Sequence, residues 1–324
     1  MKTNMLLTIC LIVKNEAEML KRHLPNLTAV ADEVIVVDTG SSDETVKVAK
    51  ELGARIFKFN WIKDFAAARN YSLQYARSRW IMCVDADELV QKEDLLKIRE
   101  WLQNAQAEVY ALPVYECERG ELKPLSIYFR PRIFRNHLGY HYVRPINEQL
   151  ADAKGKVQAG KETQDPPVYH FGAHLTTEKM EQKRERNIEL FEKMVKAKPA
   201  DIYFHFLLAN NYQGKGLVDQ ALAEYEKVIS LAPASDLAYE SMIYRAIILN
   251  NRNQLKPALD QAIAALKIKK SPAVLNILGN IFIAAKQYDY AREALEEAAT
   301  LPAGNSPDQT RLTDELRQKL EALG

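Results

Sequence analysis

Glycine is scarce in the first part of this 324-residue chain, and glycine-based phosphate loops are missing from it. Only Gly40 and Gly53 fall within the first hundred residues, and neither G-x-x-x-x-G-K-[ST] nor G-x-G-x-x-G occurs. If the chain binds a nucleotide, the charge of the phosphates must therefore be neutralised by other means.

An excess of charge of one sign is also absent, because 44 Lys and Arg residues stand against 43 Asp and Glu residues. No net field is available to gather nucleic acid or an anionic membrane. We therefore expect no nucleic-acid partner, and we expect charged side chains to act locally.

Long apolar runs and cysteines are few. The run near the N-terminus, residues 5–13, is too short to span a bilayer and leads into the polar residues 14–16, which favours a buried strand over a transmembrane segment or a cleaved leader. Of the three cysteines, Cys10 and Cys83 lie in predicted core strands, where cysteine behaves as a small hydrophobe. These features predict a reduced, cytoplasmic protein.

The first part of the chain alternates short apolar runs with segments of helical period. This rhythm predicts crossover units on a parallel sheet with both faces covered. The predicted strands are residues 6–13, 33–38, 54–57 and 80–84, and the predicted helices are 18–27, 43–52 and 65–77. Further strands are expected at 108–116 and 126–135, and an exposed loop at 151–167.

The character of the sequence changes near Thr176, after which helical period continues without strand signals. We therefore predict two domains, residues 1–175 and 176–324. The second contains small and large residues that recur with a period of about 34, as in tetratricopeptide repeats. The matched positions are Leu208, Ala209, Tyr212, Ala221, Tyr225, Val228 and Pro233 in one copy and Leu278, Gly279, Phe282, Ala291, Leu295 and Ala298 in another.

A weaker middle copy has its anchor alanine at Ala258, and the anchors Ala221, Ala258 and Ala291 lie 37 and 33 positions apart. This spacing predicts a longer loop in the middle repeat. The charged, amphipathic segment 306–323 is expected to form a terminal capping helix. An ordinary helical bundle is the alternative, but small residues at matched offsets favour repeats.

Two aspartates directly follow the predicted strand 80–84. Carboxylates at the carboxyl end of a parallel strand point into the crevice where open α/β sheets bind ligands, and alternation puts Asp85 and Asp87 on the same side. Such a pair suits Mg²⁺ or Mn²⁺, whose other positions are filled by water and diphosphate oxygens. The alternative is a cap for a helix over residues 89–102.

Another acidic residue, Asp38, ends the predicted strand 33–38 and is placed to accept from ribose hydroxyls or a base. The segment after it predicts a capping box between Ser41 and Glu44. Farther along, Asp64 and Arg69 lie about one helical turn apart near a helix start. Arg69 is a candidate for a phosphate or base edge, and a surface ion pair with Asp64 is the alternative.

Together these segments resemble the family 2 glycosyltransferases of the GT-A fold, and more narrowly a bacterial branch that carries tetratricopeptide repeats. The matching stretches are residues 6–16, 36–45, 64–70 and 84–88. The resemblance implies an α/β GT-A fold, Rossmann-like with a mostly parallel sheet, followed by an all-α repeat domain. It also implies a metal-dependent enzyme that uses a nucleoside-diphosphate sugar and inverts the anomeric centre.

The resemblance further implies roles for individual residues. Asp87 would be the direct metal ligand, with Asp85 beside it in the D-x-D element, and Arg69 would lie near the base or the diphosphate. The base and ribose would be held around Val13, Lys14, Asn15, Glu16 and Asp38.

Two downstream segments resemble the acceptor side of the family. Residues 144–149 resemble a segment that usually ends in His-Glu, which makes Glu148 the candidate general base, although Asn147 stands where the histidine is common. A solvated glutamate is the alternative. Residues 168–172 resemble a His-x-Gly element in which His170 reaches the metal or diphosphate, and a structural histidine is its alternative. A zinc site with His174 is discounted, because no glutamate follows His170.

These features favour transfer of a sugar, with UDP as the expected carrier, to a peptide or protein acceptor bound partly by the repeats. A second hypothesis makes the acceptor a glycan or lipid-linked glycan of a surface polysaccharide and gives the repeats a role in a homodimer. A third is an inactive repeat scaffold. A nucleotidyltransferase is disfavoured because it normally opens with a glycine-rich loop.

Overall fold

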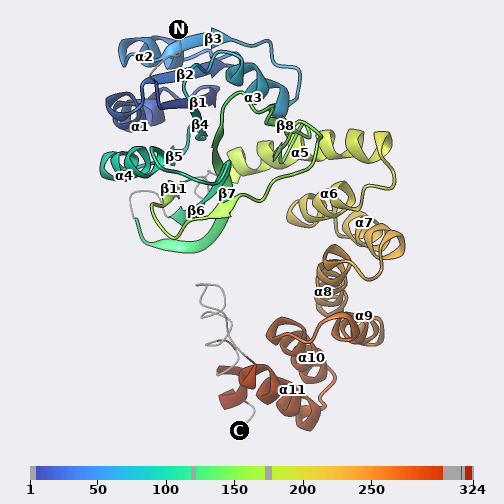
Figure 1. The fold of residues 1–324 in the computed structure, drawn as a ribbon. Helices are drawn as coiled ribbons and strands as arrows, with labels where there is room; N and C mark the ends of the chain where they lie inside the picture. The colour runs from blue at the N-terminus through green and yellow to red at the C-terminus, as the bar shows by residue number, and fades with distance from the viewer. Residues whose placement is uncertain (1–4, 118–121, 172–176, 302–314, 316–317, 323–324) are drawn as a thin grey trace. The chain divides into compact units, whose positions relative to one another are not determined.

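The structure is a computed structural model that describes residues 5–117, 122–171, 177–301, 315 and 318–322. The chain divides into two compact units, Met1–Leu175 and Thr176–Gly324 (Figure 1). Within the described ranges, no helix is both long enough and apolar enough to cross a membrane.

The first unit is built on a nine-stranded sheet in the order β3-β2-β1-β4-β7-β6-β11-β5, with β10 paired to β6. The strands are β1 (Leu7–Val13), β2 (Glu33–Asp38), β3 (Arg55–Lys58), β4 (Trp80–Cys83), β5 (Glu88–Leu89), β6 (Val109–Cys117), β7 (Pro124–Arg135), β10 (Lys161–Glu162) and β11 (Val168–His170). The strands β8 (His141–Val143) and β9 (Gln149–Ala151) form a separate two-stranded sheet.

Strand direction changes in the middle of the sheet. The first four strands in space are parallel, whereas β7 runs antiparallel to both β4 and β6. The predicted α/β sheet is therefore confirmed, but it is mixed beyond β4. Parallel strands place their carboxyl ends at one edge, and the polar residues after β1, β2 and β4 lie there.

Both faces of the sheet are covered, which explains why the central strands are almost wholly apolar. All six residues of β2 are buried. One face packs against the core residues of α1 (Ala17–Val30), α2 (Thr45–Glu51) and α4 (Lys92–Leu102), and the other against α3 (Phe65–Leu73) and the β8–β9 sheet.

Several local predictions for the first unit are wrong. Helix α2 begins at Thr45, and Ser41 instead accepts a hydrogen bond from the Asn15 backbone N–H, so the capping box does not form. Helix α3 ends at Leu73 rather than at residue 77. The predicted loop 151–167 contains strand β10, which joins the sheet through β6.

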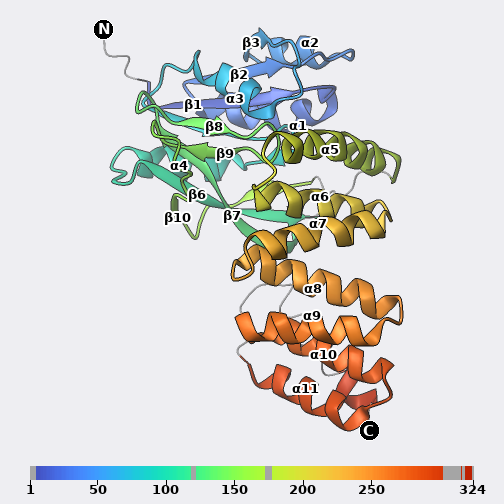
Figure 2. The ribbon, with the colours of Figure 1, turned by 90° about the vertical axis from the view of Figure 1, so that its right-hand side faces the viewer.

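The second unit consists of helices in the described ranges, and consecutive helices pair into hairpins (Figure 2). The helices are α5 (Thr177–Ala197), α6 (Ile202–Gly214), α7 (Val218–Leu231), α8 (Asp236–Asn251), α9 (Leu255–Ile268), α10 (Pro272–Ala284) and α11 (Tyr288–Thr300). Each of the last three hairpins has a left-handed residue in its turn, at Gly216, Asn253 and Lys286. These three have the same spacing as the anchor alanines.

Small residues permit close packing within the hairpins. The anchors Ala221, Ala258 and Ala291 are fully buried. A Cβ on Gly279 would lie 2.6 Å from Cδ2 of Leu295, so only glycine fits there without a shift. The extra length of the middle repeat lies mainly in α8, which has 16 residues against 13 in α6 and α10, so the predicted longer loop is wrong. Most of the predicted capping helix 306–323 lies outside the described residues.

Candidate active site

Asp85 lies between two buried arginines at the carboxyl end of β4. Its Oδ1 contacts the Arg69 guanidinium, and its Oδ2 accepts from Arg132 at 3.0 Å. Burial opposes ionisation, but the two cations outweigh it and hold the pKa of the Asp85 carboxyl far below its usual value. Asp85 is therefore an anion whose oxygens are already paired.

Arg69 comes from α3, whose start is fixed by Asp64. The Asp64 side chain accepts from the Ala67 backbone N–H at 2.8 Å, and this cap turns the buried Arg69 toward the sheet. Arg69 Nε donates to Glu148 Oε1 at 2.6 Å. The proposed surface ion pair between Asp64 and Arg69 is therefore wrong.

Glu148 is half-buried and directly precedes β9, so the alternative of a solvated glutamate is also wrong. Its pairing with Arg69 joins it to Asp85, because one guanidinium contacts both carboxylates. A planar guanidinium fixes two such partners in direction as well as in distance. The structure thus brings together Arg69, Asp85 and Glu148.

Glu88 completes a turn after β4. Its Oε2 accepts from the Asp85 backbone N–H at 2.9 Å, and its Oε1 contacts Arg132. Burial raises the pKa of Glu88 to about 7, against the opposing effect of Arg132. Helix α4 begins only at Lys92 with Gln91 as its N-cap residue, so the idea that Asp85 or Asp87 caps this helix is wrong.

Asp87 and Asp85 contact different side chains. Its Oδ2 lies 3.3 Å from His170 Nε2, and Glu116 Oε2 lies 2.8 Å from His170 Nδ1. The Asp87 side chain is 39% exposed against 25% for Asp85, which makes Asp87 the more accessible carboxylate. Burial opposes a charged imidazole, but Asp87 and Glu116 overcome it and raise the pKa of His170 to about 10.

The segments after β1 and β2 form a separate polar cluster. Asn15, with a left-handed backbone, accepts from the Ser42 backbone N–H at 2.8 Å through its side chain and donates its own N–H to Ser41 Oγ at 2.9 Å. The Asp38 carboxylate accepts from the backbone N–H groups of Gly40 and Ser41. These bonds fix the two loops at the carboxyl edge.

Two more of the residues predicted for this cluster, Val13 and Glu16, form hydrogen bonds within the fold. The Val13 carbonyl accepts from both the backbone and the hydroxyl of Thr39, each at 3.0 Å. The Glu16 backbone N–H donates to Thr45 Oγ1 at 2.8 Å. The predicted site residues therefore fall into three groups: the cluster after β1 and β2, the Arg69 network, and the Asp87–His170 pair.

Two site residues, one buried and one half-buried, received no role from the sequence. Arg132 and Glu116 lie on β7 and β6, and their partners are 47 and 54 positions away in the chain. Alternation within a strand indicates only which face of the sheet a residue occupies, so the sequence does not identify these partners. The strand order, which places β6 beside β11, brings Glu116 to His170.

The donor set of Asp87 and His170 suits a divalent cation once the imidazole has given up a proton, which the charge of the cation itself favours. A carboxylate and an imidazole are ligands that Mn²⁺ accepts, and a carboxylate behind the second imidazole nitrogen, as Glu116 is here, commonly orients a ligating histidine. Among the described residues there is no group of three or more His, Cys, Asp and Glu side chains suited to an ion. Other ligands would therefore have to complete the coordination.

The chain thus combines an α/β unit that has acidic and basic side chains at the carboxyl edge of its sheet with a unit of helical hairpins. Residues 8–155 match the model of glycosyl transferase family 2, and residues 202–235 match that of a tetratricopeptide repeat. Residues 8–155 of the first unit thus form a domain of the glycosyl transferase family 2 type, and the helical unit contains a tetratricopeptide repeat. Both confirm the resemblance found in the sequence.

Similar proteins have descriptions that agree with these two matches. A tetratricopeptide repeat-containing protein of Synechococcus elongatus is 28% identical, over 90% of this chain and 75% of its own length. The glycosyltransferase SunS of Bacillus subtilis is 28% identical over 60% of this chain. An uncharacterised glycosyltransferase of Rickettsia bellii is 37% identical over 26% of this chain. The matched regions span only 46% of SunS and 28% of the Rickettsia protein.

Solved structures show weaker likenesses. S. aureus TarS 1–349 in complex with UDP-GlcNAc has 15% identity and a TM-score of 0.43, over 97% of this chain and 92% of its own. MamA has 17% identity and a TM-score of 0.36, over 46% of this chain and 94% of its own. Likenesses of this size carry no argument about the site.

Proposed function

We propose that this glycosyltransferase moves a sugar, with inversion, from a UDP-sugar to a polypeptide acceptor, and that it requires Mn²⁺ or Mg²⁺. The observation that carries the proposal is the link from Asp85 through Arg69 to Glu148. It holds a carboxylate, suited to act as a base, beside the edge where α/β sheets bind nucleotides.

The cluster after β1 and β2 supports the nucleotide part of the proposal. Each Asp38 oxygen accepts one backbone hydrogen bond, and a carboxylate oxygen accepts two, so capacity remains for ribose hydroxyls. Asn15, Glu16 and the backbone at Val13 would surround the base. Arg69 would lie on the side of the diphosphate.

Asp87 and His170 would hold the cation, and Glu116 would keep the imidazole oriented. When bound, the ion offsets charge on the departing nucleoside diphosphate. Two protein ligands leave positions for diphosphate oxygens and water, as Mg²⁺ and Mn²⁺ sites on nucleotides require.

Glu148 would act as the general base. Arg69 engages Oε1, and the described residues provide no hydrogen bond to Oε2, which is therefore the oxygen open to an acceptor. In the step, the nucleophilic atom of the acceptor forms a bond to the anomeric carbon while the bond from that carbon to the diphosphate oxygen breaks. The acceptor proton passes to Glu148 Oε2. Attack from the side opposite the leaving group inverts the centre.

The helical unit supports a polypeptide acceptor. Stacked hairpins present extended surfaces suited to a chain segment. The alternative gives the repeats a role in dimerisation only and makes the acceptor a glycan.

A thermal-shift screen of UDP-, GDP- and dTDP-sugars, with and without Mn²⁺, tests the donor. A ligand that binds the native state raises the unfolding temperature, so only UDP-sugars with Mn²⁺ should give a large shift. Incubation of the preferred donor with peptides and with glycans then tests the acceptor. Transfer to glycans alone would refute a polypeptide acceptor, and pyrophosphate release from UTP plus a sugar phosphate would refute the transferase assignment.

A further inference from the structure

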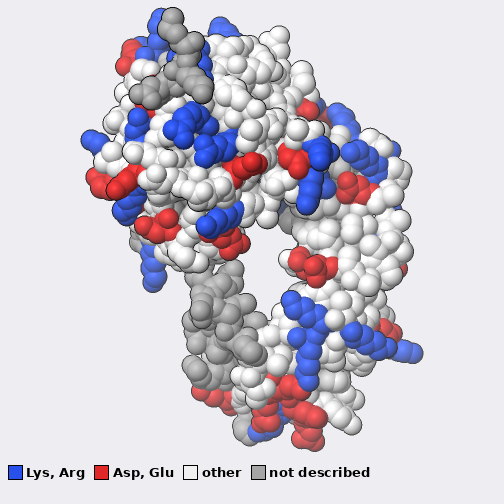
Figure 3. Space-filling view, in the orientation of Figure 1, with Lys and Arg blue, Asp and Glu red and all other residues white. Residues whose placement is uncertain are grey.

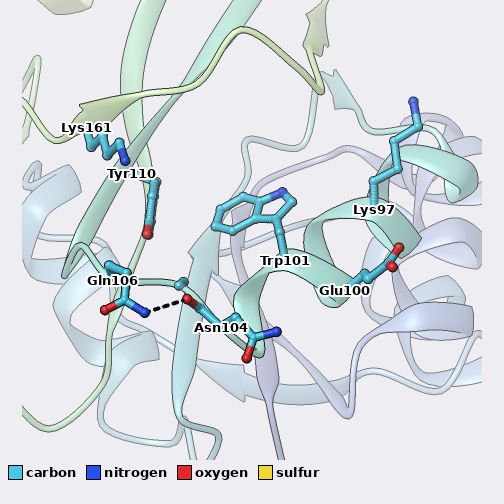
Figure 4. A pocket seen from close by; sticks show the side chains of 8 residues that line it. Lys97, Glu100, Trp101, Asn104, Gln106, Tyr110 and Lys161 are labelled. Carbon is cyan, nitrogen blue, oxygen red and sulfur yellow. Dashed lines mark hydrogen bonds between the residues drawn. The ribbon is translucent and has the colours of Figure 1, made fainter.

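A pocket of about 620 Å³ lies where the end of α4, the start of β6 and β10 meet (Figure 4). None of its lining residues belongs to the active-site network. The ring of Tyr110, in its floor, lies 5.9 Å from that of Trp80 at the start of β4, whereas Asp85 and Asp87 follow the end of β4. The pocket is therefore a separate feature of the same unit.

A half-exposed aromatic ring lies at the centre of the lining residues. The Trp101 indole packs against Tyr110 with ring centroids 4.7 Å apart at 62°, an edge-on contact that holds the indole in place. The Tyr110 hydroxyl accepts from the Ala107 backbone N–H at 2.9 Å, which fixes the phenol in turn. A rigid indole with an open face binds flat apolar surfaces, such as the C–H face of a pyranose.

The rim of the pocket carries polar groups that are not used by the fold. The side chains of Glu100, Asn104 and Lys161 have no hydrogen bond or ion pair to other described residues. They offer an acceptor, an amide and a donor around one ring. Pockets that combine an apolar floor with a few convergent polar groups are suited to small ligands.

The charges of the rim nearly balance. Lys97 is paired with Asp94 at 3.0 Å, which leaves Lys161 and Glu100 to offset one another. In Figure 3 the surface likewise shows acidic and basic side chains intermixed. A polyanion would gain little from such a rim. A neutral ligand rich in hydroxyl groups fits it better.

The backbone conformation before β10 fixes the position of Lys161. Gly160, with φ of +77°, lies so close to β6 that a Cβ would come within 3.1 Å of the Ala111 backbone N. This close approach lets β10 pair with Tyr110 and Ala111, which brings Lys161 to the pocket. The rim is therefore fixed by sheet pairing as well as by a loop.

We propose that this pocket binds a neutral oligosaccharide, with one pyranose ring stacked on Trp101 and its hydroxyls bonded to Glu100, Asn104 and Lys161. The proposed function supplies only the origin of the ligand, which is a glycan already present on the acceptor or product. The site would retain that glycan away from the reacting end.

Binding is measured without catalysis, so this proposal and the proposed function fail independently. The probes are chitotetraose, maltotetraose and cellotetraose, titrated into the full chain and followed by saturation-transfer NMR and calorimetry. We expect at least one to bind. We expect two variants to weaken the affinity for that tetrasaccharide at least fivefold each. Trp101→Leu removes the indole but keeps apolar bulk, and Asn104→Ala removes an exposed amide.

Tyr288→Leu removes an exposed aromatic ring outside the pocket and serves as the matched control, with no expected change. Unfolding temperatures show whether each variant is folded. The proposal is overturned if no tetrasaccharide binds, if folded Trp101→Leu and Asn104→Ala bind like the parent protein, or if UMP binds at Trp101 in place of the sugars.

Discussion

Arg69 Nε donates to Glu148 Oε1 at 2.6 Å although the two residues are 79 positions apart in the chain. The same guanidinium contacts Asp85, so a single buried side chain joins the turn after β4 to the segment before β9. Under the proposed function the two residues have different roles. Arg69 would hold Glu148 in position, and Glu148 would take the proton of the acceptor.

Glu148→Gln is expected to lower kcat by about 10²–10⁴-fold, because the amide still accepts from Arg69 but takes no proton. The KM for the donor should stay unchanged. Steady-state kinetics with the preferred UDP-sugar measure both constants. Unchanged kcat would remove Glu148 from the role of base.

Arg69→Lys is expected to lower kcat by about 10²-fold, because an ammonium does not hold two carboxylates in a fixed fork. The variant should also unfold at a lower temperature, since Asp85 and Glu148 lose part of their pairing. Arg99→Lys, at the Asp32 pair remote from the site, is the control. Equal losses in both variants would contradict a positioning role for Arg69.

Asp87→Asn is expected to abolish the Mn²⁺-dependent part of the donor thermal shift. Glu116→Gln, which alters the residue that accepts from both His170 and the Tyr128 hydroxyl, should weaken Mn²⁺ binding about 10–100-fold. Asp219→Asn, an 86% exposed carboxylate in the helical unit, should have no effect. An undiminished Mn²⁺ effect in Asp87→Asn would exclude a cation at this place.

The stability of the first unit should fall in acid, and Glu33 should carry part of the loss. Burial opposes ionisation of Glu33, but the Arg77 backbone N–H, Thr8 and the arginines Arg55 and Arg77 outweigh it, so its pKa in the fold lies below the ordinary value of 4.5. A lowered pKa stabilises the fold fully above the unfolded value, and this stabilisation is lost as the pH falls below about 4.5.

Tryptophan fluorescence is suited to this measurement, because all three tryptophans lie in the first unit. Urea midpoints between pH 3 and 7 should fall toward acid in the parent protein. They should fall less steeply in Glu33→Gln, which should be less stable at pH 7 by about 1–3 kcal/mol. Parallel curves for both proteins would show that Glu33 is not the titrating group.

Gly279→Ala should destabilise the helical unit by about 1–3 kcal/mol, because the added methyl meets Leu295 in a packed seam. Gly214→Ala is the matched control, since the nearest atom to its Cβ is the flexible Arg184 side chain. Urea unfolding followed by circular dichroism measures the stability of both variants. Similar midpoints for the two variants would contradict close packing at Gly279.

The sequence is sufficient to predict features with a short period. Residues 33–38 are a run of buried strand residues bounded by polar ones, and the repeats have small residues at fixed offsets. Both patterns report local packing. They predict the α/β sheet and the hairpins because each residue's environment is set by near neighbours in the chain.

The active-site contacts were less accessible to prediction. The D-x-D spacing suggests two carboxylates acting together, but Asp85 turns to Arg69 and Arg132 while Asp87 turns to His170. These partners come from α3, β7 and β11, whose positions follow from strand order. Likewise, the capping box failed because the Ser41 hydroxyl accepts from Asn15, in the neighbouring loop.

The left-handed turns have the same spacing along the chain as the buried alanines, so each helical hairpin repeats as one structural module. In such arrays each module is stabilised by its immediate neighbours, so folding becomes less cooperative between modules that lie far apart. For the same reason, the array can change in length by whole modules. The helical array can therefore gain or lose whole hairpins while the sheet of the first unit and the side chains at its carboxyl edge stay unaltered.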